Sequence, residues 1–172
     1  MKKMVDLTIF LNFELEGIGD DLEFPELERF SVHMNRLQGL PKIVAPKLKH
    51  LGFSDGRLDE MEQYLDCISA PQIESINLLY CRIPKISGLK RFPKTRQLGL
   101  NGNRLTRFDG VEEAPEIKVL IAKRNPIQDV SCLKKLPSLR FLTVDKEVVK
   151  KHPFLRKKYV MNKIGLGDCL DE

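Results

Sequence analysis

Apolar residues recur along this chain in one pattern that repeats about every 22 residues. Each unit follows a proline that itself comes after an apolar residue, and the six prolines are Pro25, Pro46, Pro71, Pro93, Pro115 and Pro137. The intervals between them are 21, 25, 22, 22 and 22 residues. Because a fixed period of this size is typical of stacked repeats, it predicts the architecture before any single element is assigned.

The positions within a unit have distinct characters. Counted from the second residue after the proline, positions 1, 4, 6 and 11 are apolar, with Thr95 as a polar exception at position 1. Apolar residues at 4 and 6 with a free residue between them predict a strand. The units begin near residues 4, 27, 48, 73, 95, 117 and 139. In the first unit Glu14 falls on position 11, so we infer a one-residue insertion that brings Leu15 and Ile18 inward.

Position 9 is occupied by a small set of residues: Asn12, Asn35, Asn103, Asn125, Gly56 and Cys81. An asparagine amide can both donate and accept, so a buried one can pair with backbone groups of a turn that has no strand partner. Cys81 is small enough to fit the same place with a weaker donor. We therefore interpret position 9 as the buried centre of a turn.

The resulting consensus, LxxLxLxxNxL, resembles that of leucine-rich repeats. The apolar spacing that follows it, as in Leu105, Phe108, Val111 and Ala114, resembles the 22-residue class of a phosphatase regulatory subunit, the spliceosomal A-prime subunit and the internalins. The resemblance covers about residues 4–149. It implies an α/β fold: a right-handed leucine-rich-repeat solenoid with a curved parallel sheet on the concave face and 3₁₀ or irregular segments on the convex side. We expect one domain over residues 1–172.

Two stretches depart from the repeat. The third unit is longer, and the apolar spacing of Met61, Tyr64, Leu65 and Ile68 predicts a helix near 59–68. The seventh unit breaks off at Glu147, so we predict a helical C-terminal cap over about 145–164. Asp145 should be the N-cap of a helix at 146–151, and Pro153 should stand in the first turn of a second helix. The residues expected to face the stack are Leu155, Tyr159 and Ile164.

The rest of the composition indicates the class of protein and its cellular compartment. A hydrophobic content of 42% suits a single domain with its own core, and no apolar run approaches the ~20 residues that span a bilayer. Four cysteines without a CxxC pair, and no glycosylation sequon, favour the cytoplasm or nucleus. No nucleophile, phosphate-loop or zinc motif is present, so we expect no catalytic residue, metal or cofactor. We interpret His33 and His50 as surface histidines.

Candidate binding residues lie on the strand face that points away from the core. If positions 4 and 6 point inward, positions 3, 5 and 7 point outward. In the last regular strands this places apolar residues side by side, next to two bases, and the fourth unit adds a further apolar–aromatic pair. The predicted partner-binding residues are Leu79, Tyr80, Val119, Ile121, Lys123, Arg124 and Phe141. The alternative is that the basic cap covers the apolar residues.

Charge is distributed unevenly along the chain. Residues 1–60 carry 8 bases and 11 acids, whereas residues 61–172 carry 21 bases and 13 acids. This asymmetry reflects either a solvated helical face or an acidic partner, protein or RNA, for the C-terminal half. The resemblance implies a non-catalytic protein-interaction scaffold that binds a partner protein on the concave face. The alternative is an RNA- or ribonucleoprotein-associated subunit, and an enzyme without a known motif ranks third. We expect a monomer that does not bind membranes.

Overall fold

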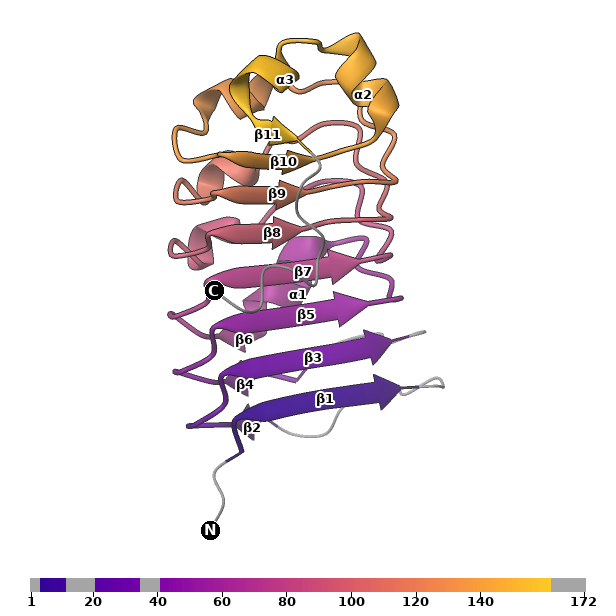
Figure 1. Ribbon diagram of the computed structural model, residues 1–172. Helices are drawn as coiled ribbons and strands as arrows, with labels where there is room; N and C mark the ends of the chain where they lie inside the picture. Colours follow the sequence, from indigo (N-terminus) through magenta and orange to yellow (C-terminus); the bar gives the residue numbers. More distant parts are fainter. Residues whose placement is uncertain (1–3, 12–20, 35–40, 162–172) are drawn as a thin grey trace.

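The computed structural model describes residues 4–11, 21–34 and 41–161. Eight parallel strands form one sheet whose order follows the chain, and Figure 1 shows them as successive rungs. They are β1 (Asp6–Leu11), β3 (Arg29–Met34), β5 (His50–Ser54), β7 (Ser75–Leu79), β8 (Gln97–Gly99), β9 (Val119–Ile121), β10 (Phe141–Thr143) and β11 (Val160–Met161). The predicted parallel sheet is confirmed, with one strand more than the seven units because the chain returns to the sheet after its terminal helices.

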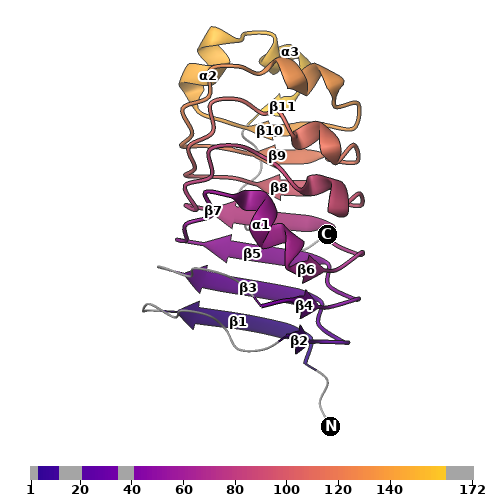
Figure 2. The same ribbon diagram turned by 180° about the vertical axis from the view of Figure 1, so that it is seen from behind.

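The connections between these strands change character along the chain. In the first three units they contain a second parallel sheet of β2 (Leu22–Glu23), β4 (Ile43–Val44) and β6 (Ile68–Ser69). Figure 2 shows this sheet and helix α1 (Met61–Asp66) on the side opposite the long strands. Later connections carry the 3₁₀ turns η1 (Leu89–Arg91), η2 (Val111–Glu113) and η3 (Ser131–Lys135). The helix near 59–68 and the 3₁₀ segments were predicted, but the second sheet was not, because two-residue strands are too short to show a period.

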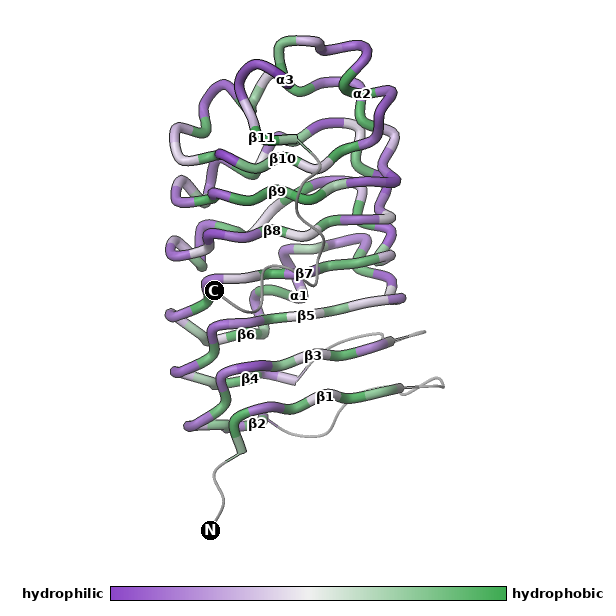
Figure 3. The backbone as a smooth tube through the Cα atoms, in the orientation of Figure 1, coloured by the Kyte–Doolittle hydropathy of each residue, from purple (hydrophilic) through white to green (hydrophobic). Residues whose placement is uncertain are grey.

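The strand register agrees with the position numbering. Residues at position 3 stand opposite one another from strand to strand: Asp6, Arg29, His50, Ser75, Gln97, Val119 and Phe141. Positions 4 and 6 face the core, and Leu98 and Leu100 are fully buried there. Burying one such side chain stabilises the fold by roughly 1.5–3 kcal/mol. In Figure 3 green hydrophobic segments recur along the successive strands.

Position 9 is buried, as predicted, in the four described units that keep the turn, at Gly56, Cys81, Asn103 and Asn125. The Asn103 Oδ1 atom accepts from the backbone N–H groups of Cys81 at 3.0 Å and Ile83 at 3.1 Å. Its Nδ2 atom donates to the carbonyls of Leu78 and Leu100. One unit later, Asn125 Oδ1 accepts from the Leu105 N–H, and its Nδ2 atom donates to the Leu100 and Ala122 carbonyls. Asn12, Asn35 and the insertion inferred near Glu14 lie outside the described residues.

The C-terminal cap follows the prediction with two differences. Helices α2 (Lys146–Lys151) and α3 (Leu155–Lys158) close the end of the stack, and Leu155 and Tyr159 are buried against it. The Tyr159 hydroxyl donates to the Leu133 carbonyl at 2.8 Å. Asp145 is the N-cap residue by position, but its carboxylate accepts from the Arg124 N–H instead of capping α2. Pro153 precedes the N-cap of α3, and Ile164 lies outside the described residues.

Candidate functional site

The outward face of the eight-stranded sheet, here called the open face, carries positions 3, 5 and 7. Val119 and Phe141 stand directly opposite each other on β9 and β10, and both are partly exposed. Leu79 at the end of β7 is also partly exposed. None of these three side chains belongs to the hydrophobic core or packs against it. Their prediction as outward-facing apolar residues is confirmed.

Ile121 corrects the prediction, because it is only 2% exposed although it too lies outside the hydrophobic core. Its strand neighbours on the open face are Gly99 and Thr143, which are both buried. Side chains in the middle column of a parallel sheet have neighbours about 4.8 Å away on both sides, as well as the residues two positions before and after on their own strand. Alternation assigns a face to a residue but does not set its exposure. A charge at position 121 would be buried.

Tyr80 and Arg124 come together although 44 residues separate them in sequence. The Arg124 Nη1 group donates to the Tyr80 hydroxyl, and the guanidinium carbon lies 5.8 Å from the ring centroid. Gly102, in the turn between them, makes this possible, because a Cβ atom there would lie 2.2 Å from the Tyr80 ring. The Arg124 N–H also donates to Asp145 Oδ2 at 2.7 Å. Sequence spacing alone gave no sign of this pair.

The backbone at this edge adopts conformations that large side chains rarely take. Position 8 is left-handed in four successive units, with φ of 59° at Asp55, 55° at Tyr80, 70° at Gly102 and 58° at Arg124. Arg82, two residues after Tyr80, has φ of 60°. For a residue with a Cβ atom this conformation costs roughly 1–2 kcal/mol. Tyr80, Arg82 and Arg124 keep it with their side chains exposed to solvent.

Four exposed bases line the turns that follow β7, β8 and β9. We call Arg82, Arg104, Lys123 and Arg124 the basic ridge; all four are exposed, and Tyr80 lies beside them. Lys123 and Arg124 were among the predicted site residues. Arg82 and Arg104 were missed, although both occupy position 10 of their units and a comparison of that position across repeats would have found them.

A shallow depression of about 180 Å³ lies on the open face between β3, β5 and β7. Its lining includes His33, His50, Gly52, Ser54 and Asn77, and His33 Nδ1 lies 2.6 Å from Ser54 Oγ. The buried His50 Nδ1 and Asn77 Oδ1 atoms have no hydrogen-bond partner in the described part of the chain. Burial lowers the pKa of His50, and the nearby Arg29 charge lowers it further. The lowered pKa favours the neutral form of His50, and the depression offers hydrogen-bonding side chains beside the Arg29 charge.

Two of the three cysteines in the described part of the chain, Cys81 and Cys132, are buried and not placed as nucleophiles. Burial raises the pKa of both the Cys81 and Cys132 thiols to about 12, so neither is a thiolate at neutral pH. Within residues 4–11, 21–34 and 41–161, no three histidine, cysteine or acidic side chains are grouped so that they could hold a metal ion. None of the helices in that part of the chain is long and apolar enough to cross a bilayer.

A scan against protein-family models and a search of curated protein sequences both return no match for this chain.

Proposed function

We propose that this protein is a non-catalytic scaffold that binds a partner protein on the open face of a leucine-rich-repeat solenoid. The observation that carries the proposal is the set of apolar side chains on that face that the core does not use. Val119 and Phe141 are paired across β9 and β10, partly exposed and outside the core. Apolar side chains that are exposed to water and do not pack in the core mark a surface that a partner can cover.

Two further features support the assignment to leucine-rich repeats. The consensus places apolar residues at positions 4 and 6, and these alternate with the outward-facing positions in the observed register. Asn103 and Asn125 at position 9 bond to backbone groups of the turns with their amides, which gives a physical reason for the residue that defines the motif. The right-handed course and the curvature of the sheet belong to the same proposal, as do a monomeric state and a place in the cytoplasm or nucleus.

Capture of a partner tests the proposal. The immobilised protein should retain a specific partner from an extract of its native source, and Phe141→Glu should abolish this retention while leaving the thermal midpoint unchanged. Phe10→Glu is the matched control, because Phe10 is an exposed aromatic residue on the same face at the far end of the sheet. Equal capture by Phe141→Glu and wild type would exclude the Val119–Phe141 surface.

The basic C-terminal end favours a second candidate, an RNA-associated subunit. Residues 118–161 contain 12 bases and 3 acids, a net charge of +9. Binding of labelled oligouridylate should then fall steeply as salt rises, because each neutralised phosphate releases counterions. Binding that is weak at low salt, or that does not depend on salt, would leave the protein-binding proposal as the better one.

A further inference from the structure

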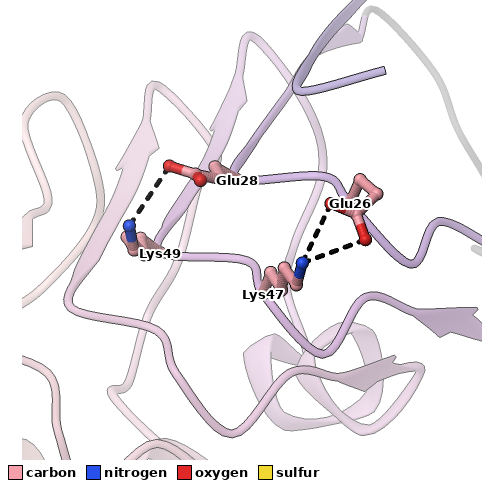
Figure 4. A network of polar contacts seen from close by, with 4 residues as sticks. All are labelled: Glu26, Glu28, Lys47 and Lys49. Carbon is pink, nitrogen blue, oxygen red and sulfur yellow. Dashed lines mark hydrogen bonds and ion pairs between the residues drawn. The ribbon is translucent and has the colours of Figure 1, made fainter. Parts of the chain in front are cut away.

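The two ends of the strands carry their charges in different ways. Where the strands begin, bases pair with acids of neighbouring repeats: Lys47 with Glu26, Lys49 with Glu28, and Arg96 with Glu74 and Glu116. Figure 4 shows the first two of these pairs side by side. Where the strands end, the side chains of the basic ridge form no ion pair with any residue that the structure describes.

The ridge bases are also held close together. Backbone hydrogen bonds keep successive turns in register, from Arg104 N to the Ile83 carbonyl and from Gly102 N to the Lys123 carbonyl, each at 2.9 Å. Arg82 and Arg104 therefore occupy equivalent places in adjacent turns. Like charges in such places repel each other, and none of the ion pairs among the described residues offsets that repulsion. A negatively charged partner would relieve it.

Arg124 is oriented before any partner arrives. The Tyr80 hydroxyl holds its guanidinium and Asp145 holds its backbone N–H, so part of the ordering needed for binding is already complete. Of the four described non-glycine residues with positive φ, three are Tyr80, Arg82 and Arg124. Backbone strain of this kind tends to persist where exposed side chains have a role.

We propose that the basic ridge binds an extended acidic segment of the partner protein, lying across the turns along the direction of the stack. This inference rests on the proposed function, since it names the chemistry of the partner. The first and third turns of the ridge are two strand spacings apart, about 9.6 Å, and about three residues of extended peptide cover that distance. Carboxylates fit the arginine fork through paired hydrogen bonds.

The use made of Tyr80 favours a peptide over RNA. Single-stranded nucleic acid is held largely by bases stacked on free aromatic rings. The Tyr80 ring lies against Gly102 and beside the Arg124 guanidinium, so it is engaged within the protein. The other exposed aromatic side chain of the described residues, Phe10, belongs to β1 and stacks on His33 at 4.7 Å. The ridge therefore offers charge without a stacking platform.

Fluorescence anisotropy with a labelled oligoglutamate peptide tests the inference. Wild type should bind this peptide and not an oligoglutamine of equal length. The triple variant Arg82→Gln, Arg104→Gln, Arg124→Gln should weaken binding roughly tenfold or more. The matched triple Lys47→Gln, Lys49→Gln, Arg96→Gln removes the same charge from the paired edge and should weaken it by less than about twofold. Tyr80→Phe, which removes only the hydroxyl that holds Arg124, should weaken it by about two- to threefold.

Three results would overturn the inference. Equal weakening by the two triple variants would mean that only the net charge of the protein is sensed. No preference for oligoglutamate over oligoglutamine would exclude an acidic segment, and tighter binding of oligouridylate at the same salt concentration would assign the ridge to RNA. If the ridge fails in any of these ways while Phe141→Glu still abolishes partner capture, the proposed function stands without this partner chemistry.

Discussion

Two successive turns of the stack, residues 80–83 and 102–105, differ in the residue at position 9 and in their backbone conformation. In the second, position 9 is Asn103, and only Gly102 has a positive φ. The Asn103 amide donates to the Leu100 carbonyl of its own unit and also bonds to the Cys81 N–H and the Leu78 carbonyl of the unit before it. In the first, Cys81 fills the same place, the Leu58 N–H donates to the Cys81 carbonyl, and both Tyr80 and Arg82 are left-handed. The turn with Asn103 therefore supplies an amide that supports both turns, whereas the turn with Cys81 supplies none, has two left-handed residues that carry a Cβ atom, and presents two exposed side chains of the proposed binding surface.

Removing the Asn103 amide should change the stability of the protein more than any other substitution in these two turns. Asn103→Ala leaves the N–H groups of Cys81 and Ile83 and two carbonyls without their buried partner, so we expect a loss of roughly 1–3 kcal/mol in the free energy of unfolding. Urea denaturation measures it. Asn101→Ala, which removes one exposed contact to Lys123 N, should lose less than about 1 kcal/mol. An unchanged midpoint for Asn103→Ala would show that the amide does not support the turn.

Alkaline pH should reveal the burial of the cysteine that replaces the amide. The Cys81 pKa rises from 9.0 to about 12 in the folded protein. Between these values the unfolded chain releases the thiol proton and the folded chain keeps it, so stability falls as pH rises above 9. The slope reaches up to about 1.4 kcal/mol per pH unit for one thiol. Cys81→Ala should decline less steeply between pH 9 and 10, and parallel curves would contradict the prediction.

Relieving the strain in the first turn should have a smaller effect of opposite sign. Arg82→Gly removes a side chain from a left-handed position, and we expect a gain of roughly 0.5–1 kcal/mol in thermal unfolding. Arg104→Gly is the matched control. It occupies the same position one repeat later without a positive φ, so glycine there should lower stability by a similar amount. If both variants are destabilised, the φ of Arg82 has no energetic consequence.

Adding an amide to the first turn should matter least. Cys81→Asn brings no large gain, because the Leu58 N–H already has the Cys81 carbonyl as its acceptor at 2.8 Å. We expect a change within about 0.5 kcal/mol, measured by urea denaturation. A gain of more than about 1 kcal/mol in the free energy of unfolding would contradict this expectation. It would mean that the two turns differ only in the residue at position 9.

The strands could be predicted from the sequence because their apolar residues recur with a fixed period. Positions 4 and 6 alternate with the outward-facing residues, and this assigned Leu98 and Leu120 to the core and Gln97 and Val119 to the open face. The β2–β4–β6 sheet could not be predicted, because two residues cannot define a period and its pairing depends on how neighbouring repeats stack.

The candidate site was less predictable for a different reason. Alternation gave the direction of Ile121 but not its 2% exposure, which depends on every group around it. The Tyr80–Arg124 pair depends on left-handed backbone at two non-glycine residues and on the missing side chain of Gly102. Single residues of this kind have no periodic signal, so the structure was needed to bring the pair together.

The Tyr80–Arg124 contact also bears on how the molecule comes apart. A stack held by contacts between adjacent layers can fray from its ends, one layer at a time. Most side-chain hydrogen bonds among the described residues join positions 20–25 apart. The Tyr80–Arg124 bond joins residues 44 apart and spans the layer of Gly102. When a force pulls the two ends of the chain apart, we expect the layers of Tyr80, Gly102 and Arg124 to unfold together. The part of the chain that carries the basic ridge should therefore resist layer-by-layer unfolding.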